Sequence, residues 1–276
     1  MDQLGLEGMP TRLFACTPSK LLAWLDCPRR YRFQYVDRPT PPRGPAWAHN
    51  TIGTSVHLAL ARLWDLPVTS RTPDAARRLL EGAWRTEGFA DDRQATRWKG
   101  YAGDMVAAYV GALDVEAEPR GVERTVAFTS SALAVSGRVD RVDERDGAVV
   151  VVDYKTGRSP LSTDDARGSL ALALYVLGCR RTFRRPSLRV ELHHLPSQQV
   201  HAWEHTEESL ARHVGRAEAI AAEAVAAVEF PARPSSLCAW CDFAQHCPEG
   251  REASGGPKKP WAGLAEERAP LEDESA

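Results

Sequence analysis

Short β-type segments dominate the chain between about residues 123 and 204. The clearest is residues 149–152, a run of four valines that is typical of a strand buried on both faces. Residues 135–143 form a second such segment, and the Asp146-Gly147 pair between the two is a strong signal for a two-residue hairpin turn. Further strands are predicted at residues 123–128, 188–195 and 198–204. The pattern predicts a mixed sheet.

Apolar residues recur at helical spacing on both sides of, and within, this β-rich region. Threonine–proline pairs at residues 17–18 and 72–73 are typical helix starts, with threonine as N-cap and proline at the first helical position. Pro28 requires the first helix to bend or break, and Asn50 or Thr51 is expected to cap the second. Helices are predicted at residues 17–36, 51–66, 73–86, 94–114, 164–181 and 207–228.

The predicted hairpin brings two carboxylates together. With Asp146 and Gly147 as its turn, the register places Asp140 directly opposite Asp153. Like charges in that position repel each other and destabilise a hairpin. Lys155 projects from the same face as Asp153, because side chains alternate along a strand. A divalent cation between the carboxylates would relieve the repulsion, whereas a register slip of one residue would separate them onto opposite faces.

These side chains suit metal-assisted phosphodiester hydrolysis. Carboxylate oxygens bind Mg²⁺ or Mn²⁺, which polarises a phosphate and lowers the pKa of a bound water. A nearby lysine can hold that water or neutralise charge in the transition state. His57 lies beside the apolar stripe of its predicted helix, one turn after Gly53, and would add a nitrogen ligand that favours Mn²⁺. The alternative is that Asp140 and Lys155 make ordinary cross-strand pairs and that His57 is a packed side chain.

Three of the six cysteines have the spacing of a metal site. Cys238, Cys241 and Cys247 form a C-x2-C-x5-C pattern followed by proline, one ligand short of a tetrahedral set. Cys27 is the best fourth candidate, because it also precedes a proline at a predicted helix break. Four thiolates bind either Zn²⁺ or an iron–sulfur cluster, and spacing does not distinguish them. Either would close a loop of roughly two hundred residues and stabilise the fold by a few kcal/mol.

Basic and aromatic side chains alternate at the end of the first predicted helix. Arg29, Arg30 and Arg32 interleave with Tyr31 and Phe33. Such a mixture suits a nucleic-acid backbone with exposed bases. The alternative is an amphipathic helix whose aromatic side chains face the core while the arginines face solvent.

Overall composition constrains the partners less than these motifs do. The 276 residues are 43% hydrophobic and carry a net charge of −2, so bulk charge neither indicates nor excludes a polyanionic partner. No apolar run is long enough to span a membrane, and the N-terminus lacks the apolar core of a signal peptide. We therefore expect a cytoplasmic protein with no membrane association, in which cysteines are more often metal ligands or free thiols than disulfides.

Taken together, these motifs resemble the PD-(D/E)xK nuclease superfamily, in its RecB-like exonuclease branch that carries an iron–sulfur cluster. That branch includes the AddB-type nuclease domains and the CRISPR-associated adaptation nucleases. The resemblance covers most of residues 17–248, with the pieces in the family's order. The matching pieces are TPSKLLAWLDCPRRYRFQYV, GTSVHLAL, SGRVDRVDE, VVVVDYKTG, LALYVLG and CAWCDFAQHC.

The resemblance implies a role for each candidate residue. His57, Asp140, Asp153 and the backbone carbonyl of Tyr154 would bind the catalytic metal, with Asp140, Asp153 and Lys155 as the catalytic set. The remaining candidates are Cys27, Cys238, Cys241 and Cys247 as ligands of a structural [4Fe–4S] cluster, and Arg29, Arg30, Arg32 and Tyr175 as DNA-binding residues.

One position departs from the family pattern. The helix after the (D/E)xK motif usually carries a glutamine four residues before its tyrosine, and this chain has Ala171 before Tyr175. The departure favours a second interpretation, in which the protein is a catalytically weak iron–sulfur DNA-binding or scaffold subunit of a repair complex. A third interpretation is a zinc protein that uses the same four cysteines.

We therefore expect an α/β protein with a restriction-endonuclease-like mixed sheet flanked by helices, a helical N-terminal part and a four-cysteine iron–sulfur staple. The expected organisation is an N-terminal extension (residues 1–16), one nuclease domain (17–250) and a disordered tail (251–276). The expected activity is Mg²⁺- or Mn²⁺-dependent hydrolysis of DNA, by an exonuclease acting on single-stranded ends in repair or recombination. Because no GxxxxGK[S/T] stretch is present, any ATP-driven unwinding would come from a separate helicase.

Overall fold

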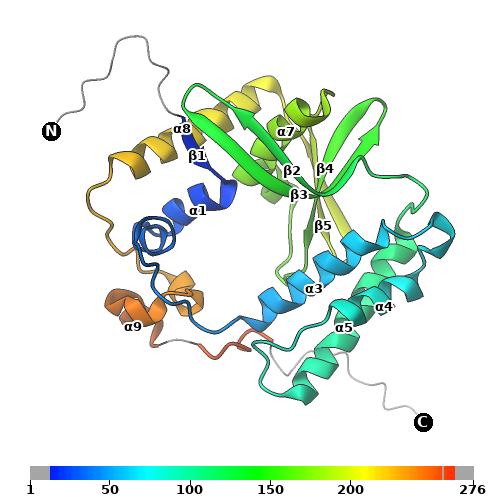
Figure 1. The fold of residues 1–276 in the computed structure, drawn as a ribbon, viewed down its shortest axis with the longest axis horizontal. Coiled ribbons are helices and arrows are strands. Elements are labelled where there is room, and N and C mark those ends of the chain that lie inside the picture. The colour runs from blue at the N-terminus through cyan, green and yellow to red at the C-terminus, as the bar shows by residue number, and fades with distance from the viewer. Residues whose placement is uncertain (1–12, 257, 265–276) are drawn as a thin grey trace.

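A computed structural model describes residues 13–256 and 258–264 (Figure 1). Within them, a mixed sheet of six strands is flanked by helices. The strands are β1 (Phe14–Cys16), β2 (Gly121–Thr129), β3 (Leu133–Arg145), β4 (Ala148–Lys155), β5 (Arg189–His194) and β6 (Gln199–Glu204). The α-helices are α1 (Pro18–Asp26), α2 (Pro28–Tyr31), α3 (Ala48–Leu63), α4 (Pro73–Ala83), α5 (Asp92–Ala112), α6 (Thr163–Gly168), α7 (Leu170–Phe183), α8 (Glu207–Ala226) and α9 (Pro248–Ser254). Short 3-10 or π segments are η1 (Arg32–Val36), η2 (Val68–Ser70), η3 (Ser236–Trp240) and η4 (Ala244–His246).

Strand β3 organises the sheet. The strand order is β1-β3-β4-β5-β6, with β2 paired along the other edge of β3. β3 runs parallel to β1 at residues 133–135 and antiparallel to β4 at residues 141–145. Between these two stretches, residues 136–139 have a strand partner only on the β2 side. The sheet therefore forks beside Asp140.

The predicted hairpin register is confirmed. Its paired residues run from Arg141 opposite Val152 to Arg145 opposite Ala148, so the next position brings Asp140 opposite Asp153. Asp146 and Gly147 both have positive φ, 51° and 77°, which is the backbone of a type I′ turn. The sequence of the turn thus determines which side chains meet at the fork.

Both faces of β4 are buried, as its valine run indicates. Val150 and Val152 pack into the cluster formed with α3, α4 and α5, whereas Val149 and Val151 pack with α7. Figure 1 shows α3, α4 and α5 together on one side of the sheet and α7 with α8 on the other. A further cluster joins α1 and α8 to β1.

Some elements differ from the expectation in their bounds. The predicted helix at 164–181 is two helices, because Ser169 leaves the helical conformation and its hydroxyl caps α7 by accepting from the Leu172 backbone N–H. Helix α3 starts earlier than predicted, with Trp47 rather than Asn50 or Thr51 at the N-cap. The predicted break before Pro28 is confirmed, since Cys27 is extended between α1 and α2.

The chain ends also differ from the expectation where the structure describes them. Residues 14–16 of the expected N-terminal extension form β1, which is too short to show periodicity; residues 1–12 lie outside the described residues. Beyond residue 250, α9 continues to Ser254, and Leu264 is buried against the α3–α5 cluster. Residues 251–256 and 258–264 are therefore not a disordered tail, whereas 257 and 265–276 are not described. No helix in the described ranges has the length and apolarity needed to cross a membrane.

Candidate metal centre and cysteine cavity

Three side chains from different elements meet at the fork of the sheet. His57 comes from α3, Glu123 from β2 and Asp140 from β3, and one potential ligand atom of each lies within 4.8 Å of the others. His57 Nδ1 is 3.2 Å from Asp140 Oδ1. Gly53 allows α3 to approach the sheet here, because a β-carbon at that position would lie 3.2 Å from Thr156 Oγ1. One imidazole nitrogen and two carboxylates form a candidate site for a hard or borderline divalent cation.

Glu123 is the member of this group that sequence reasoning missed as a ligand. It lies opposite Asp140, between the Val122 and Arg124 pairings of β2 with β3, and its φ of 47° is rare for a side chain of this kind. Arg138 Nε lies 2.8 Å from Glu123 Oε2. Burial raises the pKa of the Glu123 carboxyl, and the Arg138 charge opposes that rise. The local backbone distortion turns a strand-end carboxylate towards the other two ligands.

The aspartate and lysine of the D-x-K motif form an ion pair beside this group. Lys155 Nζ lies 2.7 Å from Asp153 Oδ2. Burial raises the pKa of Asp153; the Lys155 ammonium opposes this, and the negative charge of Asp140 adds to it. Asp140 Oδ2 also accepts a 2.8 Å hydrogen bond from the backbone N–H of Tyr154. Asp140 thus contacts both His57 and the D-x-K strand.

The electrostatics of the site favour a cation. Burial lowers the pKa of His57, but the hydrogen bond and charge of Asp140, together with the nearby carboxylates, outweigh it, so the net pKa lies above its usual value. Asp153 and Glu123 add to that field. A cavity of about 750 Å³, lined by His57, Glu123, Arg138 and Asp140, opens onto the site.

A buried hydrogen-bond network lies next to the ligands. The Arg141 guanidinium, 2% exposed, donates to the hydroxyls of Tyr109 at 3.1 Å and Tyr154 at 3.2 Å and pairs with Asp143 at 2.8 Å. The Tyr109 hydroxyl is also 2.8 Å from Nδ1 of His193. Because Arg141 follows Asp140 and Tyr154 follows Asp153, the network holds the backbone on which both aspartates are carried.

Tyr175 lies against β3. A β-carbon on Gly137 would approach Cε1 of Tyr175 to 2.5 Å, so only glycine allows this contact. Burial and the charges of Asp153 and Asp140 raise the pKa of Tyr175 to about 12, which keeps its hydroxyl protonated and available as a donor. Ala171 lies one turn earlier on α7.

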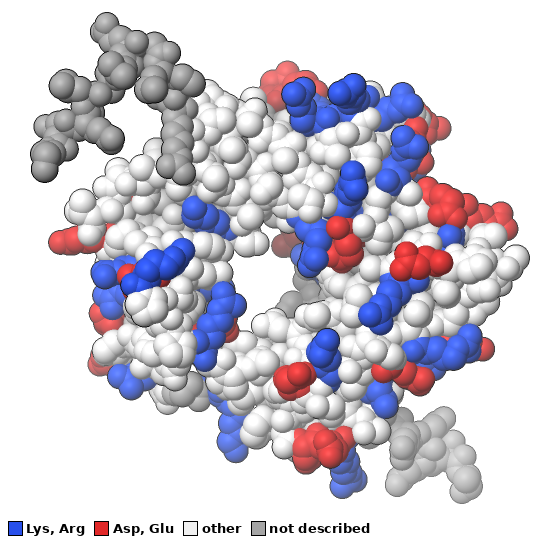
Figure 2. Space-filling view, in the orientation of Figure 1, with Lys and Arg blue, Asp and Glu red and all other residues white. Residues whose placement is uncertain are grey.

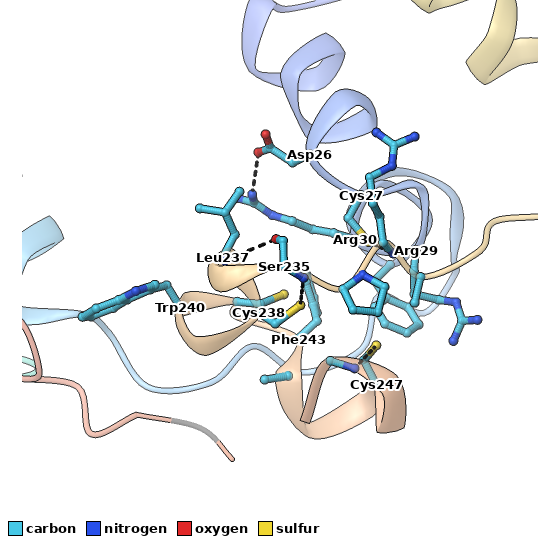
Figure 3. A pocket seen from close by; sticks show the side chains of 17 residues that line it. Asp26, Cys27, Arg29, Arg30, Ser235, Leu237, Cys238, Trp240, Phe243 and Cys247 are labelled. Atoms are coloured by element: carbon cyan, nitrogen blue, oxygen red, sulfur yellow. Dashed lines mark hydrogen bonds and ion pairs between the residues drawn. The ribbon is translucent and has the colours of Figure 1, made fainter. Parts of the chain in front are cut away.

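The four candidate cysteines line a common cavity of about 230 Å³, away from the metal centre (Figure 3). Cys27 comes from the junction of α1 and α2, and Cys238, Cys241 and Cys247 come from the η3–α9 segment. Backbone N–H groups of Arg233, Ser235 and Gly250 donate to sulfur atoms of Cys27, Cys238 and Cys247 over 3.3–3.4 Å. N–H groups aimed at sulfur are typical of bound thiolates.

The cavity is built around the sulfur atoms. A β-carbon on Gly250 would lie 3.2 Å from Sγ of Cys247 and 3.6 Å from Sγ of Cys238, so a side chain there would fill the space. Among the described residues, no three of the four cysteine sulfurs lie within 4.8 Å of one another. Four thiols on one cavity suit either Zn²⁺ or an iron–sulfur cluster.

The basic residues expected to bind DNA have partners within the protein. Arg30 pairs with Asp26 at 3.0 Å, and Arg32 pairs with Asp37 at 2.9 Å. Arg29 Nε donates to the Phe230 carbonyl oxygen at 2.9 Å. Of the interleaved aromatic side chains, Tyr31 is 4% exposed and packs on Trp24. The structure places Arg29 and Arg30 at the cysteine cavity rather than beside the metal centre.

Fold and site together define a nuclease of the metal-dependent, restriction-endonuclease-like class. The model of the PD-(D/E)XK nuclease superfamily matches residues 15–248, and the chain belongs to this superfamily. No curated protein matches the chain. A solved structure entitled "Crystal structure of SSO0001" is similar to it, with 14% identity and a TM-score of 0.41 over 88% of this chain and 90% of that one. Superfamily membership indicates divalent-metal-dependent nuclease activity, for which His57, Glu123 and Asp140 form a candidate acidic site.

Proposed function

We propose that this protein is a Mg²⁺- or Mn²⁺-dependent DNA exonuclease of the RecB-like branch, which hydrolyses phosphodiester bonds at single-stranded ends in repair or recombination. The observation that carries the proposal is the meeting of His57, Glu123 and Asp140 at the fork of the sheet, directly beside the Asp153–Lys155 pair. A structural ion-pair network would not need three carboxylates converging on one imidazole.

In the proposed mechanism His57, Asp140, Asp153 and the Tyr154 carbonyl would hold the metal, with Glu123 as an additional ligand. A divalent ion at this position would supply a water of lowered pKa and a positive charge beside the phosphate. Asp153 orients the Lys155 ammonium, which would neutralise charge on the phosphate as the water oxygen bonds to phosphorus and the P–O bond to the leaving nucleotide breaks. The attacking water would lose its proton to solvent, and the leaving oxygen would take one from solvent. The Arg141 network keeps the two aspartate-bearing strands in register during this step.

We further propose that Cys27, Cys238, Cys241 and Cys247 bind a structural [4Fe–4S] cluster. The meeting of the four cysteines at one cavity and the backbone N–H groups directed at three of the sulfurs support this assignment. Arg29 and Arg30 line the cavity and would offset the negative charge of a thiolate-bound cluster. Protein purified without oxygen is expected to be brown and to contain iron; a colourless protein with stoichiometric zinc would refute the cluster.

Surface shape supports a single-stranded substrate. Figure 2 shows an opening near the centre of the molecule, with basic side chains on both sides of it. A flexible single strand follows such a surface more readily than a stiff duplex. A cytoplasmic location, where thiolates stay reduced, and a separate helicase partner complete the proposal.

The test is a metal-dependent assay on end-labelled and circular DNA, each single- and double-stranded. Wild-type protein is expected to degrade end-bearing single strands in Mg²⁺ or Mn²⁺ and to leave circles intact. Asp153→Ala and Lys155→Ala should abolish cleavage while DNA binding persists. Equal cleavage by wild type and both variants would exclude this mechanism.

Ala171 favours a second function, that of a catalytically weak DNA-binding or scaffold subunit of a repair complex. Its methyl group cannot make the hydrogen bonds of the glutamine that the family usually has one turn before Tyr175. Wild-type DNA binding without cleavage in either metal would establish this function instead, and Ala171→Gln would then be expected to increase cleavage.

A further inference from the structure

A second large cavity lies on the other side of the Gly53–Thr54 turn of α3. It has a volume of about 810 Å³, shares Gly53 and Thr54 with the metal-site cavity and is lined by Lys155. We propose that this cavity binds an unpaired nucleobase of the substrate strand, next to the scissile phosphate. The inference rests on the proposed nuclease function and specifies how its substrate is recognised.

Aromatic side chains form the walls of this base cavity. Trp98 and Tyr101 come from α5, with ring centroids 5.3 Å apart in an edge-to-face arrangement that makes a corner. Trp240, from the cysteine-bearing η3 segment, contributes a third ring. Every nucleobase has a planar face that stacks on such rings, independent of its hydrogen-bonding pattern.

These aromatic rings differ from the core tyrosines nearby. Tyr109 and Tyr154 are buried and have their hydroxyls in the Arg141 network. Trp98 and Tyr101 are only half-buried, and they pack on the edge of the α3–α5 cluster. The core therefore holds these rings in place while leaving part of each at the cavity.

The polar groups of the cavity suit the rest of a nucleotide. Lys155 provides positive charge at the end nearest the metal centre, and Arg158 provides it in the loop that follows β4. Arg158 Nη2 donates to the Gly263 carbonyl oxygen at 2.6 Å, which draws residues 258–264 into the wall. Cationic groups at the rim and aromatic rings inside are the combination that single-stranded nucleic acid requires.

The cavity also links the two regions of the molecule. Trp240 and Leu237 line both the base cavity and the cysteine cavity. Both residues flank Cys238, so a group bound by the cysteines fixes the segment that carries them. A base within a duplex is stacked on both faces and paired along one edge, so it cannot enter, and this cavity would select unpaired DNA.

The test compares oligonucleotides that carry one abasic residue at successive positions. The 276-residue protein is titrated against each fluorescent single strand with Ca²⁺ in place of Mg²⁺, to measure binding without turnover, and affinity is read by anisotropy. For wild type, one abasic position is expected to weaken binding about tenfold relative to its neighbours. In Trp98→Ala, an abasic residue at that position should weaken binding less than twofold. Trp203→Ala, which removes another half-buried tryptophan that does not line the cavity, should retain the wild-type profile.

Tyr101→Leu provides a second variant if Trp98→Ala does not fold. It should likewise reduce the loss of affinity that an abasic residue at the same position causes. An abasic effect that is equal in wild type and both cavity variants, or no position-dependent effect at all, overturns the base site. Metal-dependent cleavage that still requires Lys155 would then leave the nuclease function standing. Absence of metal-dependent cleavage by wild type would instead overturn the function on which the inference rests.

Discussion

The metal centre and the cysteine cavity represent opposite ways of building a site. At the metal centre, Asp140 and Asp153 are neighbours across one hairpin, and their charges repel each other until a cation is bound. In the cysteine cavity, Cys27 and the three C-terminal cysteines come from distant parts of the chain, and the bound group would hold those parts together. Under the proposed function, the first arrangement would lower stability in exchange for chemistry, and the second would supply stability.

This difference assigns distinct consequences to losing either site. A metal-centre substitution should remove activity and leave the fold as stable or more stable. A cysteine substitution should destabilise the fold and reduce activity through the unfolded fraction and through Trp240. The following experiments test this contrast.

The largest expected effect is that of Cys241→Ala on stability. A link from Cys27 to the η3–α9 segment closes about two hundred residues, which the chain-entropy model values at about 5 kcal/mol. For a domain of this size we expect the Tm to fall by about 10–20 °C, measured by anaerobic thermal unfolding. Cys179→Ala removes a buried thiol outside the cavity and should retain the bound iron with a much smaller shift. An equal fall in Tm for Cys241→Ala and Cys179→Ala would contradict a stabilising group bound by the four cysteines.

Asp140→Asn should show the reverse pattern. Loss of one charged ligand is expected to reduce kcat/KM by about a thousandfold, because charge stabilisation in the transition state is lost. The Tm without added metal should be unchanged or higher, because a repelling carboxylate has been removed. Asp146→Asn, at the turn of the same hairpin, keeps a residue that tolerates positive φ and should alter neither quantity. A large drop in Tm for Asp140→Asn would contradict the contrast.

Tyr109→Phe tests the region that couples sheet and helices at the metal centre. Removing this hydroxyl leaves Arg141 and His193 each without one buried partner, which we expect to cost about 1–3 kcal/mol in urea unfolding. Activity should fall by less than for Asp140→Asn, because the ligands remain. Tyr101→Phe on the same helix keeps the ring at the base cavity and serves as the matched control. An identical loss of unfolding free energy in both variants would show that the Arg141 network does not stabilise the metal centre.

Local signals predicted the metal centre better than its full ligand set. The Asp146-Gly147 turn determines a register, and that register places Asp140 opposite Asp153. Glu123 joins them only through a positive φ within β2, which alternation of polar and apolar residues does not encode. In the same way, the packing of Leu264 on α3–α5 depends on tertiary contacts that the composition of a polar, glycine- and proline-rich stretch does not predict.

Two histidines with opposite pKa shifts make the stability of the metal centre and that of the rest of the fold depend on pH in opposite directions. His205, between β6 and α8, has its pKa lowered to about 4 by burial and by the His213 charge. The unfolded chain therefore binds a proton that the folded protein does not, and stability falls as pH drops below about 6.5. His57 has a raised pKa, so its contribution is complete below about 6.5 and is lost as pH rises through the folded value.

Urea unfolding in the presence of a chelator, at pH 5 and pH 7, measures the contribution of His205 to the pH dependence of stability. Wild type should lose about 1–2 kcal/mol more than His205→Gln between the two pH values, because glutamine keeps a polar group beside Ser209 and does not titrate. His57→Gln should leave that loss intact and flatten the dependence above pH 6.5 instead. If His57→Gln instead abolished the fall in unfolding free energy at pH 5, acid destabilisation would originate at the metal centre. The ionised carboxylates there would then stabilise the fold, which contradicts the repulsion proposed between them.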